Sequence, residues 1–369
     1  MKAGWQTLPF DEAVADESAG NLKTPQSEFL EKGNFAVVDQ GKELISGYVD
    51  DESRLCSATL PVVVFGDHTR CLKFVDFPFC MGADGIKVLR PKVEADVKYL
   101  YHYLRQLRLH DGGYDRHFKY LKRAVVLLPP LADQRRIAEV LDRAEALRAK
   151  RRAALAQLDS LTQSVFLDLF GDPVINPKRW ARKPVREIGR VITGNTPPRA
   201  NPGNYGHAIE WIKSDNINTP HYYVTKAEEG LSESGKAMAR IAPAGSILVT
   251  CIAGSPDCIG NAAMADREVA FNQQINAFIP EFGDPHFYYN QILVGKRLIQ
   301  EASTAGMKGM VSKGRFEQIR LLVPPINLQR EFAHRVSAVE KLKTAQRASL
   351  AELDALFASL QHRAFRGEL

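Results

Sequence analysis

The residue combinations that usually perform catalysis are missing from this chain of 369 residues. An adenine methyltransferase needs an Asn/Asp-Pro-Pro-aromatic loop to hold the flipped base, but the Pro-Pro pairs at 129 and 197 follow Leu-Leu and Asn-Thr. There is no Gly-x-x-x-x-Gly-Lys-Ser/Thr phosphate loop and no His-Glu-x-x-His metal motif. Pro256-Asp257 resembles the start of a nuclease site, but Asp266-Arg267-Glu268 lacks the acid-x-Lys pair. The sequence therefore predicts a non-catalytic protein, without a bound metal or cofactor of its own.

The composition is that of an ordinary globular protein with a modest basic excess. The net charge is +6 and the pI is near 9.0, which favours a polyanionic partner without requiring one. Five scattered cysteines form no Cys-x-x-Cys pair, so we expect reduced thiols and a cytoplasmic protein. The start of the chain leads into acidic residues, so no signal peptide is expected. No apolar run reaches the roughly 20 residues that span a bilayer.

Two basic clusters could contact phosphate groups or could be plain solvated surface. One interrupts the first long helix described below, where a solvated face or a partner contact is the simpler interpretation. The other stands at the start of the second half of the chain, where both interpretations remain open. The members of the two clusters are Arg148, Lys150, Arg151 and Arg152, and then Lys178, Arg179, Arg182, Lys183, Arg186 and Arg190.

An ungapped internal repeat determines how the chain is organised. Residues 128–170 return as residues 323–365, a shift of 195 positions, with Pro129-Pro130 matching Pro324-Pro325 and Gln134-Arg135 matching Gln329-Arg330. We therefore predict two copies of one plan, each a lobe followed by a helix. The expected domains are residues 1–127 (first lobe), 128–171 (central helix), 172–322 (second lobe) and 323–369 (C-terminal helix).

Each repeated segment is predicted to be a long amphipathic helix. Apolar residues recur at intervals of three and four residues, with Asp133 and Asn327 as possible N-caps and Gly171 and Gly367 after the helix ends. Such a narrow stripe over four or five heptads usually packs on another helix, so we expect an antiparallel coiled coil and a pseudo-two-fold molecule. The residues expected in this seam, or in contact with a partner, are Ile137, Leu141, Leu155, Leu158, Val336, Leu350, Leu353 and Leu356.

The two lobes are predicted to be small α+β domains with a common frame. Both begin near a tryptophan, Trp5 or Trp180, and both end in a strand that leads into Pro-Pro. Both have a β-rich stretch followed by glycine, then a helical segment (97–109 and 286–303), then a glycine-rich basic loop. The loops differ in sequence, which indicates two versions of one binding device with different targets.

The whole chain resembles a specificity subunit of a Type I restriction-modification system. The resemblance rests on the Leu-Pro-Pro-Leu-Ala-Asp-Gln-Arg-Arg-Ile-Ala run from residue 128, on its echo from 323, and on the Leu-x-x-Leu-Asp-x-Leu run of each helix. Thr193-Gly194-Asn195-Thr196-Pro197 resembles the Gly-x-Thr-Pro opening of such domains, and residues 272–276 resemble their Asn-Gln-Gln run. Residues 64–70 resemble another recurrent stretch, although the first lobe lacks a clear Gly-x-Thr-Pro.

The resemblance implies a function for each part. Each lobe would be a target recognition domain for one half of a split site in double-stranded DNA, and the helices would set the spacer between the halves. The helices would also dock two methyltransferase (M) subunits, which restriction and motor (R) subunits can join. S-adenosylmethionine, ATP and Mg²⁺ would belong to those partners, and no membrane is implied.

Polar loops are the expected DNA contacts, because phosphate contacts position a protein while base-edge contacts specify the sequence. The candidates are His68, Thr69, Arg70, Arg116, His117, Lys119, Asn195, Thr196, Arg199, Lys213, Ser214, Asn216, Lys308 and Lys313, together with Arg182 and Arg186 from the basic cluster. The alternative function is a non-catalytic scaffold, two lobes on a coiled coil that bind proteins rather than DNA.

Overall fold

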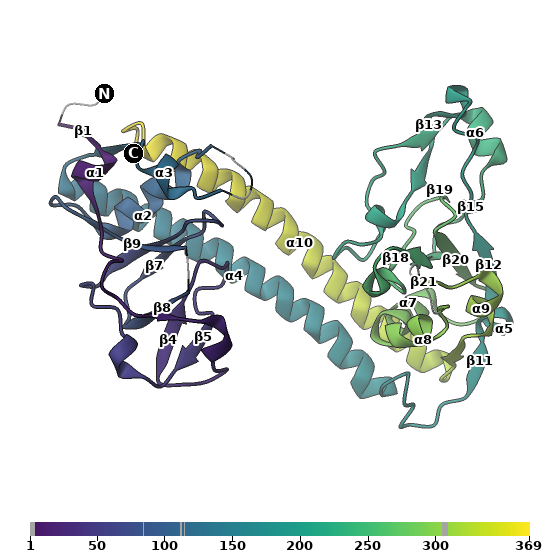
Figure 1. The fold of residues 1–369 in the computed structure, drawn as a ribbon. Coiled ribbons are helices and arrows are strands. Elements are labelled where there is room, and N and C mark those ends of the chain that lie inside the picture. The colour runs from purple at the N-terminus through teal and green to yellow at the C-terminus, as the bar shows by residue number, and fades with distance from the viewer. Residues whose placement is uncertain (1–3, 84, 111–112, 114, 305–308) are drawn as a thin grey trace. The chain divides into compact units, whose positions relative to one another are not determined.

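The computed structural model describes residues 4–83, 85–110, 113, 115–304 and 309–369, and they form two compact units. The first unit combines residues 1–152 with 349–369, and the second is residues 153–348. Each unit therefore contains one lobe and one part of each long helix, and each is described by itself. Figure 1 shows the elements along the chain. No helix of the described residues is long and apolar enough to cross a membrane.

The first lobe is built on two four-stranded sheets. One has the order β2-β9-β6-β7 and the other β3-β8-β4-β5, while β1 and β10 pair separately and antiparallel. The core behind the first sheet includes Phe10, Phe65 and Tyr99. Its elements are β1 (Gln6–Pro9), α1 (Phe10–Ala13), β2 (Val14–Asp16), β3 (Lys23–Thr24), β4 (Phe35–Val38), β5 (Gly47–Val49), β6 (Val62–Gly66), β7 (Leu72–Val75), β8 (Phe79–Gly82), β9 (Ile86–Pro91), α2 (Val97–Gln106), α3 (Phe118–Leu121) and β10 (Val125–Leu128).

The second lobe has the same plan with longer connections. Its four-stranded sheets have the orders β12-β20-β16-β18 and β14-β13-β19-β15, and β11 pairs with β22 as β1 pairs with β10. Its elements are β11 (Arg182–Pro184), α5 (Val185–Ile188), β12 (Gly189–Thr193), β13 (Tyr205–Ile212), β14 (Gly230–Leu231), α6 (Glu233–Met238), β15 (Ile241–Ala242), β16 (Ile247–Thr250), β17 (Ile252–Ala253), β18 (Ala262–Met264), β19 (Val269–Phe271), β20 (Ile275–Pro280), α7 (Pro285–Val294), α8 (Lys296–Glu301), β21 (Gly309–Met310), α9 (Lys313–Gln318) and β22 (Arg320–Leu322).

The strand pairings confirm that the lobes share a frame. The first sheet is antiparallel throughout in both lobes, with β2, β9, β6 and β7 corresponding to β12, β20, β16 and β18. In the second sheet, β4 pairs parallel with β8 as β13 pairs parallel with β19. The edge strand differs, because β3 runs parallel to β8 whereas β15 runs antiparallel to β19. The mixed α+β class expected from the sequence is therefore correct for both lobes.

The two long helices are α4 (Leu131–Phe170) and α10 (Ile326–Ala364). Both begin directly after a Pro-Pro pair, so the predicted N-caps Asp133 and Asn327 are wrong, since both residues lie inside the first turn. The prediction failed because proline fits the first turn of a helix, so a helix can start beside Pro-Pro without a polar cap. The predicted end is correct, because Gly171 follows α4 with a left-handed φ of 77° and its N–H donates to the Leu167 carbonyl.

The start of one long helix packs against the end of the other within each unit. In the first unit, Ile137 and Leu141 of α4 share a core with Phe357 and Ala364 of α10. In the second unit, the rings of Phe166 and Phe332 meet edge to face, with centroids 5.5 Å apart. The pairing is antiparallel in both units, as the stripes predicted (Figure 1).

A glutamine near the start of each long helix connects it to the helix of its own lobe. The Gln134 side chain donates to the Pro129 carbonyl and accepts the N–H of Asp96, the residue that caps α2. Gln329 makes the equivalent bonds to the Pro324 carbonyl and to the N–H of Asp284, which caps α7. The glutamine of the repeated Gln-Arg pair therefore connects the start of a long helix to the N-cap of a lobe helix in both units.

A charged cluster joins the two long helices in each unit, and the repeat relates the two clusters. In the second unit, Lys343 of α10 bonds to Glu340 at 2.6 Å and to Asp159 of α4 at 2.8 Å. The shift of 195 positions relates Lys343, Glu340 and Asp159 to Arg148, Glu145 and Asp354. In the first unit, Arg148 contacts Asp354 at 2.6 Å and Glu145 at 4.0 Å.

Burial corrects the details of the predicted stripe. Ile137, Leu141 and Val336 are buried, whereas Leu155, Leu158, Leu350 and Leu353 are half-buried. Leu356 is 50% exposed, and its neighbour Phe357 occupies the buried position. On α10 the buried positions include the charged residues Glu340 and Lys343, whereas Leu342 between them is 53% exposed.

We predict that Lys343→Met destabilises the chain by on the order of 3 kcal/mol, because it leaves Glu340 buried without its cation. Adding Glu340→Gln should recover most of the loss, since the unpaired charge is then gone. Urea unfolding followed by circular dichroism measures both. Leu342→Ala, at a 53% exposed neighbour, is the control and should stay within about 0.5 kcal/mol. Equal losses of unfolding free energy in the single and double variants would show that an unpaired Glu340 is not the cause.

Candidate nucleic-acid interface

An aromatic floor in the second lobe brings two of the predicted DNA loops together. The indole of Trp211, near the end of β13, is buried and its N–H donates to the Asn195 carbonyl at 3.2 Å. The Arg199 guanidinium lies 4.4 Å from the centre of the Tyr205 ring and 5.0 Å from that of Trp211. The Lys213 ammonium lies 5.3 Å from Trp211. Cations held over aromatic faces are restricted in orientation, so the loops 195–199 and 213–216 form one surface.

Glu229 determines what the two cations over this floor can do. Both of its oxygens accept from the Arg199 guanidinium, and one also pairs with Lys213 at 2.6 Å. The bond from Arg199, with further help from Lys213, lowers the pKa of Glu229 to about 2, so the carboxylate stays ionised at neutral pH. Arg199 uses two of its five N–H groups on this carboxylate and Lys213 uses one of its three, so both cations keep donors for a ligand. Direct contact of either one with DNA stays a prediction.

Most of the other predicted polar residues of these two loops hold the loops themselves. The Asn195 side chain donates to the Met238 carbonyl and accepts from the Arg240 N–H. The Thr196 hydroxyl donates to the Gln273 side chain. Asn216 is buried, and its amide oxygen accepts from the Lys213 N–H at 3.0 Å. Ser214 is half-buried in the same turn. Direct DNA contact by these residues stays a prediction.

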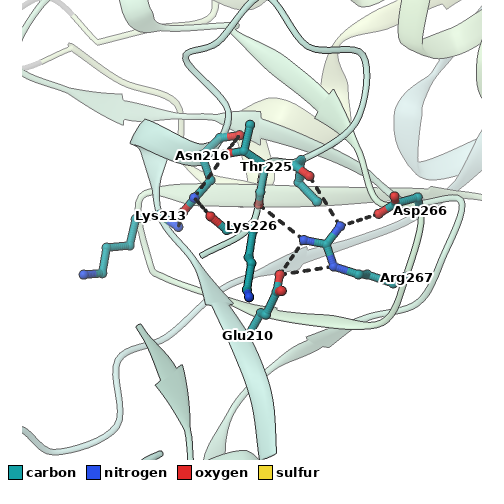
Figure 2. Close-up of polar contacts among 8 residues, drawn as sticks. Glu210, Lys213, Asn216, Thr225, Lys226, Asp266 and Arg267 are labelled. Atoms are coloured by element: carbon teal, nitrogen blue, oxygen red, sulfur yellow. Dashed lines mark hydrogen bonds and ion pairs between the residues drawn. The ribbon is translucent and has the colours of Figure 1, made fainter. Parts of the chain in front are cut away.

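Arg267 is a clamp that the sequence reasoning did not identify (Figure 2). Its guanidinium donates to Glu210 of β13, to Asp266 at 2.5 Å, and to the carbonyls of Val224 and Thr225. The Asn216 side chain holds the same segment, residues 224–226, by donating to the Lys226 carbonyl at 3.2 Å. These bonds fix the segment that bears Lys226, whose side chain is exposed.

Two exposed polar residues of the second lobe were also absent from the predicted contacts. Lys226 follows the clamped segment, and Gln273 lies at the aromatic floor, where it accepts from Thr196. Gln273 belongs to the Asn-Gln-Gln run that the sequence had already singled out, so a signal for it existed. The sequence carried no such signal for Lys226, because only the fold places this residue near β13.

The predicted loops of the first lobe also meet. The Asp67 carbonyl accepts from the His117 N–H at 2.7 Å, and the Asp67 carboxylate accepts from the Phe118 N–H at 2.7 Å. His117 is buried and its ring bonds to the Asp67 carbonyl, so it joins the loops rather than pointing outward. The Thr69 hydroxyl donates to the Gln40 carbonyl, and the Gln40 side chain accepts from the His68 N–H.

The exposed cations of these first-lobe loops are Arg70, Arg116 and Lys119. Arg70 has a left-handed φ of 61° in the turn between β6 and β7, a conformation that costs free energy for a side chain with a Cβ. Lys119 pairs with Asp115 at 2.7 Å. The loops 67–70 and 115–119 therefore present three cations from one part of the lobe.

The remaining candidates are separate from the aromatic floor. Arg182 donates to the carbonyls of Pro173 and Val174, and Arg186 is exposed on α5. Lys313 is exposed at the start of α9, with Glu317 at 3.6 Å. Lys308 lies outside the described residues. No group of His, Cys, Asp and Glu in the described part of the chain could hold a metal ion.

The sequence comparisons agree with one another. Residues 177–354 match the family described as the Type I restriction modification DNA specificity domain. The chain is 23% identical over 360 residues to the Type I restriction enzyme EcoR124I/EcoR124II specificity subunit of Escherichia coli, which covers 91% of this chain and 86% of that protein. A shorter match, 32% identical over 107 residues, covers 28% of this chain and 22% of the Type I restriction enzyme HindI specificity subunit of Haemophilus influenzae.

Solved structures show the same fold over the full length. The Type I restriction-modification S subunit from M. genitalium matches with a TM-score of 0.62 at 13% identity, covering 98% of this chain and 96% of that one. A chain from a structure on complex assembly and conformational transition of the Type I system matches with a TM-score of 0.51 at 17% identity, covering 100% and 99%. With the repeat, the paired helices and the sequence matches, these likenesses lead to one conclusion: the chain belongs to the family of Type I restriction-modification specificity subunits, the non-catalytic component that supplies DNA specificity.

Proposed function

We propose that each lobe recognises one half of a split DNA site and that the paired helices set the spacer between the halves. The observation that supports this most is the contrast between frame and surface. The two lobes share their sheet order, yet one presents Arg70, Arg116 and Lys119 and the other a Trp211 floor under Lys213. Two binding surfaces of different chemistry on one frame suit a target with two different halves. The proposed domain bounds are residues 1–127, 128–171, 172–322 and 323–369.

We also propose that the long helices dock two methyltransferase subunits, to which restriction subunits can add, in the cytoplasm. S-adenosylmethionine, ATP and Mg²⁺ would act in those partners. Four leucines on the helices support a docking role, because exposed apolar side chains gain free energy when a partner removes them from water. They form two pairs related by the repeat, Leu147 with Leu342 and Leu161 with Leu356, and each is between 46% and 53% exposed.

The experiment that tests the proposed function exchanges one lobe. Replacing residues 172–322 by the corresponding lobe of a related subunit, joined at Gly171-Asp172 and Pro324, should change one half of the methylated motif. The other half and the spacer should stay, because the first lobe and both helices are untouched. Sequencing of methylated bases in cells that express the chimera with its partner subunits measures this. A change in both halves at once would contradict recognition of one half by each lobe.

The spacer should respond to helix length only when both helices change together. The charged links stand at residues 148 and 159 on α4 and at 343 and 354 on α10, the same interval on both helices. Inserting four helical residues after Lys150 and after Ala345 keeps the links matched and adds about 6 Å to each helix. The spacer should then grow by roughly one to two base pairs at about 3.4 Å each.

The control is the same insertion in α4 alone. It places one charged link out of register, so it should lower stability and methylation rather than lengthen the spacer. Motif sequencing and thermal unfolding distinguish these results. An unchanged spacer in an active double-insertion variant would remove the helices from spacer control.

Partner docking can be tested at the exposed leucines. Leu147→Glu with Leu342→Glu should abolish co-purification with the methyltransferase subunit, because a carboxylate would be desolvated in the interface. The unfolding midpoint of the chain by itself should change little, since both side chains are about half exposed. The matched control is Ala146→Glu with Lys341→Glu, also exposed positions related by the repeat. Normal assembly by the leucine variant, or equal loss in the control, would contradict docking at these residues.

A further inference from the structure

We propose that a pocket beside the β11–β22 pair of the second lobe binds one phosphate group of the DNA backbone. It is lined by Arg182 of β11, Arg315 of α9 and Arg320 of β22. The inference rests on the proposed function, in that it takes DNA to be the ligand of this lobe. It concerns affinity and leaves the choice of bases to the loops described above.

The pocket is built by segments that the fold brings together. Arg182 and Arg320 come from opposite ends of β11 and β22, which pair antiparallel with Arg182 opposite Leu322 and Arg320 opposite Pro184. Arg315 lies in the first turn of α9, the helix that precedes β22. The concavity has a volume of about 440 Å³, which is large enough for a phosphate with part of its sugar. Leu298, Ala302 and Ile319 complete its apolar wall.

Each guanidinium is held at one edge and has further donors to offer. Arg320 donates to the Arg182 carbonyl at 2.9 Å, and Arg315 donates to the Ala302 carbonyl at 3.2 Å. Arg182 donates through a single nitrogen, Nη2, to the Pro173 and Val174 carbonyls. A guanidinium has five N–H groups, so these backbone bonds orient the side chains without exhausting them. Arginines fixed in this way bind phosphate oxygens at a low entropic cost.

The charge of the pocket is uncompensated. None of its described lining residues is acidic, and among the described residues none of the three arginines forms an ion pair with a carboxylate. The other cations nearby differ in this respect, because Arg297 pairs with Glu301 at 2.7 Å and Lys313 has Glu317 at 3.6 Å. Three like charges around one concavity repel each other, and an anion between them relieves the repulsion. A phosphodiester also offers two oxygens to the forked donors.

Among the described residues of the first lobe, two of the three arginines have no counterpart. The shared frame aligns Pro9 with Pro184, which puts Thr7 where the second lobe has Arg182 and Val125 where it has Arg320. Val125 is 52% exposed. The pocket is therefore an addition to the common frame, and it would bind the DNA of one half-site more tightly than that of the other.

The salt dependence of DNA binding tests the proposal. The full chain, assembled with its methyltransferase subunits, is titrated with duplex DNA bearing its motif over a range of salt. Arg315→Gln with Arg320→Gln should reduce the magnitude of the slope of log K against log[salt] by up to about 0.9, the value for one phosphate contact, because only Arg182 remains to neutralise the phosphate. Both side chains are exposed, so the fold should tolerate the change, and Arg182 stays in place because it holds two carbonyls. The methylated motif should be unchanged.

Arg297→Gln with Arg335→Gln is the matched control. It also removes two exposed positive charges from the second unit, but both pair with a glutamate one helical turn away, so the slope should not change. An unchanged slope in the pocket variant would overturn the proposal, and a loss of about 1.8 would show two separate phosphates rather than one shared by the pocket. A pocket variant that binds DNA normally but no longer assembles would assign the arginines to a protein partner, which also overturns it.

Inorganic phosphate distinguishes a free anion from the DNA backbone. At constant ionic strength it should raise the unfolding midpoint of the wild-type chain more than that of the pocket variant. If it does so while the slope of DNA binding is the same in both, the ligand is free phosphate and the DNA proposal fails. A failed lobe exchange with an altered slope would instead contradict the one-lobe, one-half scheme and leave the pocket standing.

Discussion

The charged link between the two long helices is the interaction on which the helix pair depends. A stripe of leucines tolerates sliding, because one leucine packs against another at many offsets. The buried Lys343 of α10 does not, since a shift by one turn would separate it from Asp159 of α4 and leave only Glu340 of its own helix as a partner. Arg148, Glu145 and Asp354 impose the same condition in the first unit, where the guanidinium also lies 4.4 Å from the Phe357 ring centre. Register is therefore set by charge, while apolar burial supplies the stability.

The hydrogen bonds of Gln134 and Gln329 connect the paired long helices to their lobes. Gln134 and Gln329 each satisfy a carbonyl of the Pro-Pro segment and the N–H of an N-cap residue, Asp96 or Asp284. A buried amide that makes bonds in two directions connects the start of a long helix to the start of a lobe helix. The orientation of each lobe helix thus follows from the long helix of its own unit. A scheme in which the helices set a DNA spacer needs such a rigid connection.

The lobes show how one frame accommodates different surfaces. Their sheets agree in order and direction apart from one edge strand, and the polar side chains that differ stand in the loops. In both lobes many predicted contact residues are occupied in holding a loop, as His117 and Asn216 are. The side chains left to face a ligand, such as Lys213, are fewer and are held in place by those neighbours. A rigid loop loses less entropy when it binds, which favours selective recognition.

The sequence by itself determined the repeat, the two long helices, the α+β lobes and the absence of a catalytic motif. These features are local or periodic, so the order of residues is enough to reveal them. Even there, the apolar pattern misplaced one seam position, because Leu356 and Phe357 are both apolar and only the packing decides that Phe357 is buried and Leu356 is 50% exposed.

Only the tertiary structure decided which polar residues serve the fold and which face outward. Asn195 is a polar loop residue like Lys213, but its side chain donates to the Met238 carbonyl and accepts from the Arg240 N–H, so it holds its own loop. The arginine pocket depends on residues 182 and 320, which antiparallel pairing brings together across most of the second lobe. No single-chain pattern encodes that proximity, because it arises from strand pairing between distant segments and from the donors and acceptors that each side chain then meets.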